Sequence, residues 1–428
     1  MDTTAENGPH RAPARLGWPD ARELAARVGA ASPLPPEVVP LADAVGRRLA
    51  GDLIADIDLP HYASAAMDGW LVTGDGPWRL GAEAESGRFA DDLPAAGAAR
   101  PIVTGAFVPH GATAVLRSES GEVVGGLLRS TVPGEPWPGQ HIRPPGTEAT
   151  RGERLIEAGA MLNPAHIAIA AATGRDELAV RAVPEVALVL TGEEVVTAGI
   201  PGPGRVRDSF GVQFPAFLGM LGGRVIAAHR VADDLDDTVR TIRNADAPLI
   251  VSTGGTGTST ADHVRAALHL LGAHVVVDGI AMRPGGPTTV AVLPGGRIVA
   301  ALPGNPLAAM LGALTVIEPL LAGLAANPPA GLRTVTAAAV PGRRGATTLA
   351  PYVWVEGRAT VSAWRGAAML RGLAEASGVL VIPPEGVADG VGAQSLALPW
   401  RTDGEGVRVR PEQLCPRICA AAERKVES

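Results

Sequence analysis

The sequence predicts a multidomain α/β protein whose central part is a doubly wound α/β domain. The chain has 428 residues, enough for several domains with separate cores. Between residues 185 and 325, apolar runs such as VALVLT and PLIVST alternate with segments of helical periodicity. Such alternation is typical of a mostly parallel sheet covered by helices on both faces. On either side, short β-like runs broken by Gly and Pro predict smaller β domains.

These patterns give the expected domain boundaries and helices. Residues 1–16 form a disordered leader; residues 17–60 and 141–183 form a helical N-terminal domain, with a β subdomain inserted at 61–140; residues 184–327 form the α/β domain, 328–402 a barrel-like C-terminal β domain and 403–428 a polar tail. The expected helices cover 19–28, 40–50, 164–173, 210–221, 235–245, 261–271 and 306–324.

Composition narrows the function classes. With 46% hydrophobic and 19% charged residues the chain is typical of a soluble globular protein, and its net charge of −7 argues against a nucleic-acid partner. No signal peptide is recognisable, and the most apolar run, 307–326, contains Glu318 and Pro319, so it predicts a core helix and not a membrane span. We therefore expect a cytoplasmic protein. Cys415 and Cys419 have no partner at metal-ligand spacing, which favours free thiols.

One strand end carries the clearest candidate site. The stretch LIVSTGGTGTSTADHV, 249–264, passes from a buried strand ending near Ser252 through Gly254, Gly255 and Gly257 into a helix. Glycines let a ligand approach the backbone, and the helix N-terminus offers free N–H groups to an anion. A tight turn without ligand is the plainer alternative. A Walker loop is excluded because Lys425 is the only lysine of the chain.

Acidic residues at the strand ends suggest what this ligand contains. Asp262 follows the glycine loop, Glu193 follows the strand VLTG, and Asp208 precedes a helix, where an N-cap role is an equal alternative. A carboxylate beside a phosphate is repulsive unless a cation lies between them or it accepts hydrogen bonds from the ligand. Together with Arg283 and the Pro303–Pro306 corner, these acids predict a ligand with phosphate and donor groups, held with Mg²⁺.

The order of several motifs resembles a known family, the molybdenum-insertion proteins of molybdenum-cofactor synthesis, called MoeA in bacteria and represented in animals by the gephyrin E domain. The motifs are AAMDGW, RPIVTGAFVPHGATAVL, HIRPPGTEATRGERLIEAG, VLTGEEVV and ALPGNPLAA, spread over residues 17–402. The resemblance implies a MoCF-type, MogA-like α/β domain, an elongated homodimer, and a site between the α/β domain of one subunit and the N-terminal part of the other. It also allows a MogA-like adenylyltransferase as a partner.

The resemblance implies a function and a role for each matching residue. The family inserts molybdate into adenylylated molybdopterin and releases AMP with the help of a divalent metal. Asp68, Glu193, Asp208 and Asp262 would be catalytic, Glu193 and Asp262 would bind Mg²⁺, and the substrates would contact Thr104, Arg143, Ser252, Gly254, Gly255, Gly257, Arg283, Pro303, Gly304, Asn305 and Pro306.

Two departures from the family pattern keep alternatives open. The Lys-Pro-Gly-Lys loop that holds molybdate reads Arg283 to Gly286, and the serine after Gly-Asn-Pro is Ala308. Each missing N–H or O–H donor to the charged oxyanion weakens its binding by roughly 1.5–3 kcal/mol. The chain is therefore expected to be a molybdenumtransferase with a remodelled oxyanion pocket. The alternatives are a non-catalytic paralogue that binds or carries the pterin, and a MogA-like adenylyltransferase.

Overall fold

The structure, a computed structural model, describes residues 15–81, 95–254 and 263–401. Gly255, Gly257 and Asp262, most of the predicted leader, and the tail with both cysteines lie outside the described residues. The chain divides into two compact units, one of Met1–Pro35 with Ala182–Ser428 and one of Pro36–Arg181. Each unit is described by itself below.

The first unit is built on a six-stranded sheet. Its strands, in spatial order, are β16 (Arg224–Arg230), β13 (Glu185–Leu190), β17 (Leu249–Thr253), β21 (Ile298–Leu302), β20 (Thr289–Val292) and β18 (His274–Asp278). The first four strands are parallel, and β20 and β18 are antiparallel to their neighbours. The sheet is thus mostly parallel, as the apolar runs predicted.

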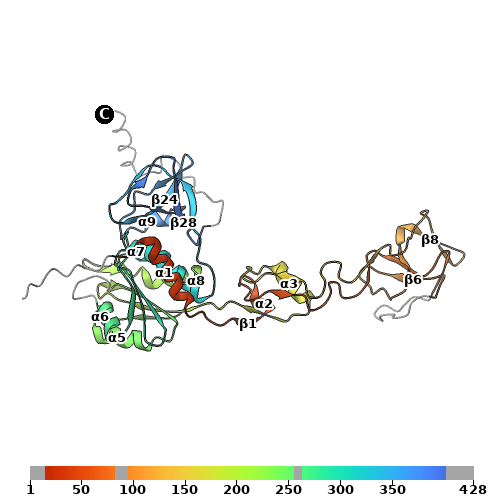
Figure 1. The fold of residues 1–428 in the computed structure, drawn as a ribbon, viewed down its shortest axis with the longest axis horizontal. Coiled ribbons are helices and arrows are strands. Elements are labelled where there is room, and N and C mark those ends of the chain that lie inside the picture. The colour runs from red at the N-terminus through yellow and green to blue at the C-terminus, as the bar shows by residue number, and fades with distance from the viewer. Residues whose placement is uncertain (1–14, 82–94, 255–262, 402–428) are drawn as a thin grey trace, which may run out of the picture. The chain divides into compact units, whose positions relative to one another are not determined.

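Helices cover both faces of this sheet (Figure 1). On one face lie α1 (Trp18–Ala30), α4 (Phe210–Met220), α7 (Pro306–Gly312), the π-helical turn η2 (Ala313–Ile317) and α8 (Glu318–Leu324); on the other lie α5 (Leu235–Asn244) and α6 (His263–Leu270). Alternate residues of β17 pack into the two hydrophobic cores on opposite faces of the sheet: Leu249 and Val251 belong to one core and Ile250 to the other.

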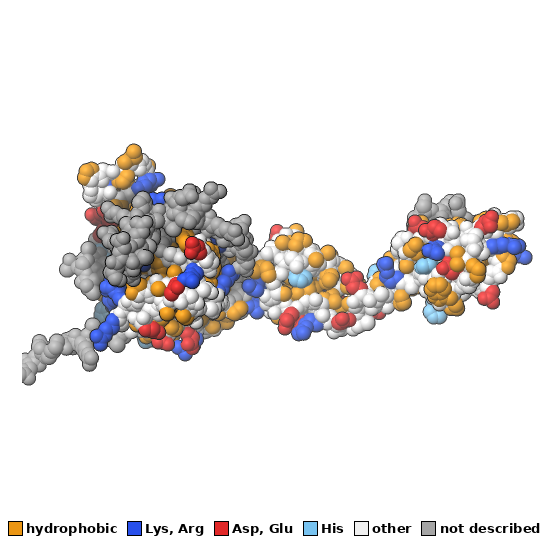
Figure 2. Space-filling model, turned by 90° about the horizontal axis from the view of Figure 1, so that it is seen from above, with side chains coloured by type: hydrophobic (Ala, Val, Ile, Leu, Met, Phe, Trp, Pro, Cys, Tyr) orange, Lys and Arg blue, Asp and Glu red, His pale blue; other side chains and the backbone are white. Residues whose placement is uncertain are grey.

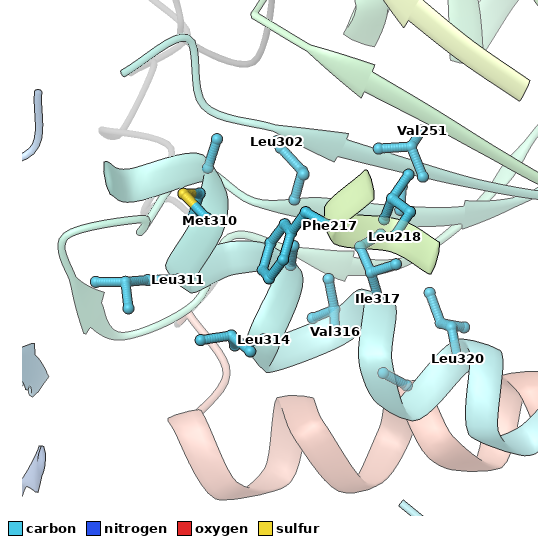
Figure 3. Packing of buried hydrophobic residues seen from close by; sticks show 14 of the residues in the cluster. Phe217, Leu218, Val251, Leu302, Met310, Leu311, Leu314, Val316, Ile317 and Leu320 are labelled. Carbon is cyan, nitrogen blue, oxygen red and sulfur yellow. The ribbon is translucent and has the colours of Figure 1, made fainter. Parts of the chain in front are cut away.

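The long apolar segment Pro306–Leu324 is the centre of the larger core. Its most apolar window is 94% buried within the structure, which agrees with a core helix. Figure 3 shows Leu311, Leu314 and Ile317 of this segment beside Phe217 and Leu218 of α4. The segment begins at the Pro303–Pro306 corner, so this packing fixes the corner against the end of β21.

Helix α1 lies in this compact unit, while the expected N-terminal domain of residues 17–60 and 141–183 stays a prediction. It packs along α8, where Gly29 and Gly323 allow close approach. A Cβ atom at Gly29 would lie 2.3 Å from the carbonyl oxygen of Leu320, and one at Gly323 would lie 2.5 Å from the backbone nitrogen of Ala30. Sequence periodicity identified the helix but carried no information on which core it joins.

Two local expectations are corrected. The leader was predicted to be disordered through residue 16, but Leu16 forms a parallel bridge with Ile280, and its carbonyl oxygen accepts a 2.7 Å hydrogen bond from the backbone of Ala281. The helix predicted over 40–50 is reduced to α2 (Leu41–Ala44). It ends there because Gly46 has φ +78° and Leu49 pairs with Val180 instead.

The C-terminal part of the first unit is a second sheet with its own core. It contains β19 (Met282–Arg283), β24 (Thr347–Val355), β26 (Gly378–Ile382), β28 (Gly392–Leu396) and β22 (Arg333–Thr336) in this order, with β25 (Arg358–Val361) beside β24. A two-stranded pair, β23 (Val340–Pro341) and β27 (Gly386–Val387), and α9 (Arg371–Ala374) complete it. Strand β19 places Arg283 opposite Thr348. The chain thus contributes a strand to the second sheet between β18 and β20 of the first sheet.

The second unit consists of small sheets and one helix of more than two turns. Three two-stranded pairs are β1 (Glu37–Pro40) with β12 (Glu177–Val180), β2 (Leu53–Ile54) with β11 (Arg154–Ile156), and β3 (Ser64–Ala65) with β10 (Ile142–Arg143). The helix is α3 (Pro164–Ala172). A six-stranded sheet contains, in spatial order, β7 (Ala114–Arg117), β4 (Gly69–Val72), β6 (Ala98–Ile102), β5 (Trp78–Leu80), β9 (Leu127–Ser130) and β8 (Gly121–Val124), with the 3₁₀ turn η1 (Ser118–Ser120) between β7 and β8 in the chain. On the face drawn in Figure 2, acidic and basic side chains are intermixed on the described surfaces.

Candidate functional site

A cavity of about 600 Å³ lies at the carboxyl ends of β13, β17 and β21. This is the edge at which ligands bind in open α/β sheets. Most of the described residues that line it come from four segments: Thr191, Gly192, Glu194 and Val195; Val206, Arg207, Asp208, Ser209 and Phe210; Thr253 and Gly254; and Gly304, Asn305 and Pro306. Asp233 and Ala368 also line it. We call it the strand-end cavity.

Glycine turns shape the wall of the strand-end cavity. Gly192 and Gly254 have φ of +116° and +88°, which favours glycine. A Cβ atom at Gly254 would lie 2.4 Å from the hydroxyl oxygen of Thr191, and that hydroxyl donates a 2.8 Å hydrogen bond to the carbonyl oxygen of Thr253. The two turns are therefore held together, and Gly254 has no room for an added side chain.

Acidic side chains border the same cavity. Asp208 accepts a 2.5 Å hydrogen bond from Arg230 and a 2.9 Å hydrogen bond from the backbone nitrogen of Gly211, so it also stabilises the start of α4. Glu194 and Asp233 are exposed and line the cavity. The described lining includes Glu194 and not Glu193, whose backbone nitrogen instead donates to Asp233 at 3.3 Å.

Two buried hydroxyl groups lie at the end of β17. The Oγ of Ser252 and the Oγ1 of Thr253 are shielded from solvent and have no hydrogen-bond partner among the described residues. Thr253 lines the strand-end cavity, whereas Ser252 faces the core on the other side of the strand. The strand that carries them leads into the glycine loop, which lies outside the described residues.

A second cavity, of about 530 Å³, has a different chemical character. Arg15, Arg283, Arg343 and Arg365 line it, together with Pro284 to Pro287, Pro303, Asn305, Ala308, Thr348, Leu349 and Ala367. None of its described lining residues is acidic, and none of the four guanidinium groups has a hydrogen-bond or ion-pair partner among the described residues. Unpaired guanidinium groups around a cavity favour a multivalent oxyanion. We call it the arginine cavity.

The two cavities adjoin at the Pro303–Pro306 corner. Asn305 lines both of them, while Pro303 lines the arginine cavity and Pro306 the strand-end cavity. The neighbouring residues Ala367 and Ala368 divide in the same way, and the carbonyl oxygen of Ala367 accepts a 3.0 Å hydrogen bond from the backbone of Ala308. A ligand in the strand-end cavity would thus lie next to an anion in the arginine cavity.

The second unit contains a separate pair of predicted site residues. Asp68 accepts hydrogen bonds from the backbone nitrogen of Thr104 at 2.7 Å and from its hydroxyl at 2.8 Å. The backbone bond, followed by the hydroxyl bond, lowers the pKa of Asp68 below its ordinary value. Arg143 lies on β10, opposite Ser64, and is exposed. Asp68 and Thr104, from two different motifs, are therefore in direct contact.

Two family models match the chain. The model described as MoeA N-terminal region (domain I and II) matches residues 18–174, and the one described as probable molybdopterin binding domain matches residues 187–323. A Mycobacterium tuberculosis protein named molybdopterin molybdenumtransferase 2 is 31% identical over 385 residues, covering 84% of this chain and 94% of the relative. The chain belongs to the MoeA family.

Other relatives and solved structures agree with MoeA membership. A molybdopterin molybdenumtransferase from Nostoc sp. is 33% identical over 302 residues, covering 67% of this chain and 68% of the relative. A crystal structure of a molybdopterin biosynthesis MoeA protein from Pyrococcus horikoshii aligns with a TM-score of 0.76 and 25% identity, covering 90% of this chain and 99% of that one. The predicted fold class, a multidomain α/β protein with a MoCF-type domain, is confirmed.

The site of this MoeA protein is only in part the one that its sequence predicted. The structure brings Asp208, Gly254, Gly304, Asn305 and Pro306 to the strand-end cavity, and Arg283 and Pro303 to the arginine cavity. Glu194 and Asp233 were not predicted, although Glu194 adjoins a predicted acid. Arg15, Arg343 and Arg365 were also missed, since each comes from a segment without a recognisable motif.

The predicted magnesium ligands fit the described residues only in part. Among these residues the structure shows no group of three or more His, Cys, Asp or Glu side chains arranged to hold a metal ion. Glu193 is outside the described lining, the carboxylate of Asp208 is already paired with Arg230, and Asp262 lies outside the described residues. Glu194 and Asp233 remain as exposed carboxylates at the cavity.

Proposed function

We propose that this MoeA protein is a molybdopterin molybdenumtransferase, which inserts molybdate into adenylylated molybdopterin and releases AMP. Curated relatives that match most of the chain carry the name molybdopterin molybdenumtransferase. Membership in their family makes the chain a transferase of molybdenum-cofactor biosynthesis. The structure adds an observation that bears on the chemistry of the site.

That observation is the pair of adjoining cavities that share Asn305. The arginine cavity offers unpaired planar guanidinium groups, which bind tetrahedral dianions such as molybdate through paired N–H donors. The strand-end cavity offers glycine turns, backbone N–H groups and acidic side chains, which suit the phosphate groups and the N–H edge of an adenylylated pterin. Their common wall would place the two substrates side by side.

The residues that line the two cavities have different roles in this proposal. Arg283, on β19, binds the oxyanion, and the Pro303–Pro306 corner separates the two substrates. Gly254 lets the ligand approach the end of β17, and the Asp208 carboxylate, held in place by its hydrogen bond from Arg230, accepts hydrogen bonds from the ligand. We further propose that Mg²⁺ assists, with Asp262 and either Glu193 or its neighbour Glu194 as ligands.

Three further properties belong to the proposal. The family resemblance supports a homodimer in which Asp68 and Thr104 of one subunit act together with the cavities of the other. It also supports a MogA-like adenylyltransferase that supplies the adenylylated substrate. A cytoplasmic location follows the expectation for a soluble biosynthetic enzyme.

The transferase proposal is tested by loading the protein with adenylylated molybdopterin and measuring AMP release against molybdate concentration. We expect saturable, molybdate-dependent release. Arg283→Ala should raise the half-saturating molybdate concentration by roughly tenfold to a hundredfold, because one charged bidentate donor is lost. Arg240→Ala, on α5, is the matched control and should change nothing. Tight pterin binding without molybdate-dependent release would instead support the non-catalytic paralogue.

The dimer proposal has its own test. Asp68→Asn and Arg283→Ala subunits are each expected to be inactive at low molybdate. If one site uses Asp68 of one subunit and Arg283 of the other, random mixing restores about a quarter of the wild-type activity, because half of the dimers carry one intact site of two. No recovery on mixing would show that each site is made by a single subunit.

A further inference from the structure

The arginine cavity contains one cation whose place in the chain is unexpected. Arg15 precedes α1 and is more than 260 positions away from the loop 283–287 that forms the cavity wall. It lies at the very end of a segment whose composition predicted disorder. Its position therefore needs an explanation in terms of contacts.

The backbone around Arg15 is fixed on both sides. Leu16 forms a parallel bridge with Ile280, and its carbonyl oxygen accepts the 2.7 Å hydrogen bond from Ala281. Two residues later, Trp18 is 1% exposed, and its indole nitrogen donates a 3.0 Å hydrogen bond to the hydroxyl of Thr315. Arg15 is thus placed beside the cavity by an anchored segment.

The Arg15 side chain lies over two glycines of the loop. A Cβ atom at Gly279 would be 3.3 Å from its Nε, and one at Gly286 would be 3.2 Å from its Nη1. Both distances are shorter than ordinary van der Waals contacts to a Cβ atom. The absence of a side chain at Gly286 is therefore what leaves room for the guanidinium group.

Gly286 is also the position at which the family motif has its second lysine. We infer that Arg15 is an oxyanion-binding residue of this cavity and supplies, from the N-terminal segment, the cation that the 283–286 loop lacks. The side chain is exposed to the cavity and has no partner among the described residues, so its charge is available to an anion. This inference rests on the proposed function for the identity of the anion, molybdate, but not for the existence of the anion site.

The test measures oxyanion binding directly, without the pterin substrate. Molybdate and tungstate are titrated into the full-length protein by isothermal titration calorimetry. We expect Arg15→Ala to weaken both by about tenfold to a hundredfold, and Arg15→Lys to lie between, since lysine keeps the charge but loses the paired donors. Arg27→Ala removes the same charge from the exposed face of α1 and should bind as the wild type does.

A double variant separates binding from a structural role. With Arg15→Ala, the nearest side chain to position 286 is removed, and the backbone oxygen of Met282, 3.2 Å from the Cβ position, remains as the next neighbour. Arg15→Ala/Gly286→Lys should then recover the affinity to within about threefold, since a cation again reaches the anion. The ligand-free variants should melt within about 2 °C of the wild type.

Unchanged oxyanion affinity in Arg15→Ala would overturn the inference, and so would the absence of oxyanion binding by the wild type. These outcomes are distinct from failure of the transferase proposal. A wild-type protein that binds tungstate through Arg15 but shows no molybdate-dependent AMP release would keep the inference and overturn the function. An active enzyme whose oxyanion affinity does not depend on Arg15 would keep the proposed function and overturn the inference.

Discussion

The hydrogen bonds between Asp68 and Thr104 change the pKa of a predicted site residue. Both donors of Thr104 point to one oxygen of the Asp68 carboxylate, at 2.7 and 2.8 Å. They stabilise the ionised form and so lower the pKa of Asp68. The ionised carboxylate therefore stabilises the fold above the unfolded-state pKa, and this contribution is lost as the pH falls through the folded-state pKa.

Substitution of Thr104 should change the titration of Asp68. Thr104→Val removes the hydroxyl donor and keeps the backbone donor, so the pKa of Asp68 should rise part of the way to its ordinary value. Thr104→Ser keeps both donors and should leave the pKa unchanged. A carboxyl-detected NMR titration of Asp68 measures both, and equal pKa values in the valine variant and the wild type would contradict the account.

A second residue-scale prediction concerns Gly254. Gly254→Ala would bring its Cβ 2.4 Å from the Thr191 hydroxyl at a φ of +88°. Gly222 has a similar φ, +95°, but nothing within 4 Å of its Cβ position. We expect Gly254→Ala to lower the melting temperature by about 4–8 °C and Gly222→Ala by about 2–4 °C. Equal shifts of the melting temperature in the two variants would show that backbone strain, and not the contact with Thr191, causes the destabilisation.

At the scale of elements, the sequence predicted the sheet and its helices well because burial there is periodic. The parallel strands are continuous apolar runs, and their carboxyl ends had to meet at one edge, so Asp208, Gly254 and the Pro303–Pro306 corner were predictable together. The arginine cavity was not, because Arg15, Arg343 and Arg365 are brought together only by tertiary packing.

The contact between α1 and the α8 segment yields an element-scale prediction. Arg22 donates 2.6 Å hydrogen bonds to Glu318 and to the carbonyl oxygen of Leu314, and both charged side chains are nearly buried. Arg22→Met leaves the Glu318 carboxylate without its ion-pair partner, with only the backbone N–H of Ala330 still donating to it at 2.6 Å, and should destabilise the first unit by about 3–5 kcal/mol. The double variant Arg22→Met/Glu318→Met should recover most of that loss in urea unfolding. Equal losses in the single and double variants would contradict this explanation.

At the scale of the whole molecule, the two units have separate cores. The clusters around Leu188 and Ile250 lie in the first unit, and those around Leu128 and Leu53 in the second. The finer domain boundaries expected within each unit stay predictions. Separate cores imply that damage to one unit leaves the fold of the other intact.

Calorimetry can measure this independence. Leu128 is fully buried in the second unit, so Leu128→Ala should destabilise that unit by about 2–5 kcal/mol and shift one of two thermal transitions. Molybdate binding in the first unit should be unchanged below that transition. Val123→Ala, at a 46% exposed position of the neighbouring strand, is the control and should shift neither. Parallel shifts of both transitions would show that the units unfold together.

We conclude that an oxyanion cavity adjoins the strand-end cavity at Asn305. Tungstate, a heavy analogue of molybdate, can be located by anomalous diffraction from a crystal grown with the ion. We expect a tungsten peak in the arginine cavity, within hydrogen-bond distance of the Arg283 and Arg15 guanidinium groups. A peak at any other place, with the arginine cavity empty, would contradict it.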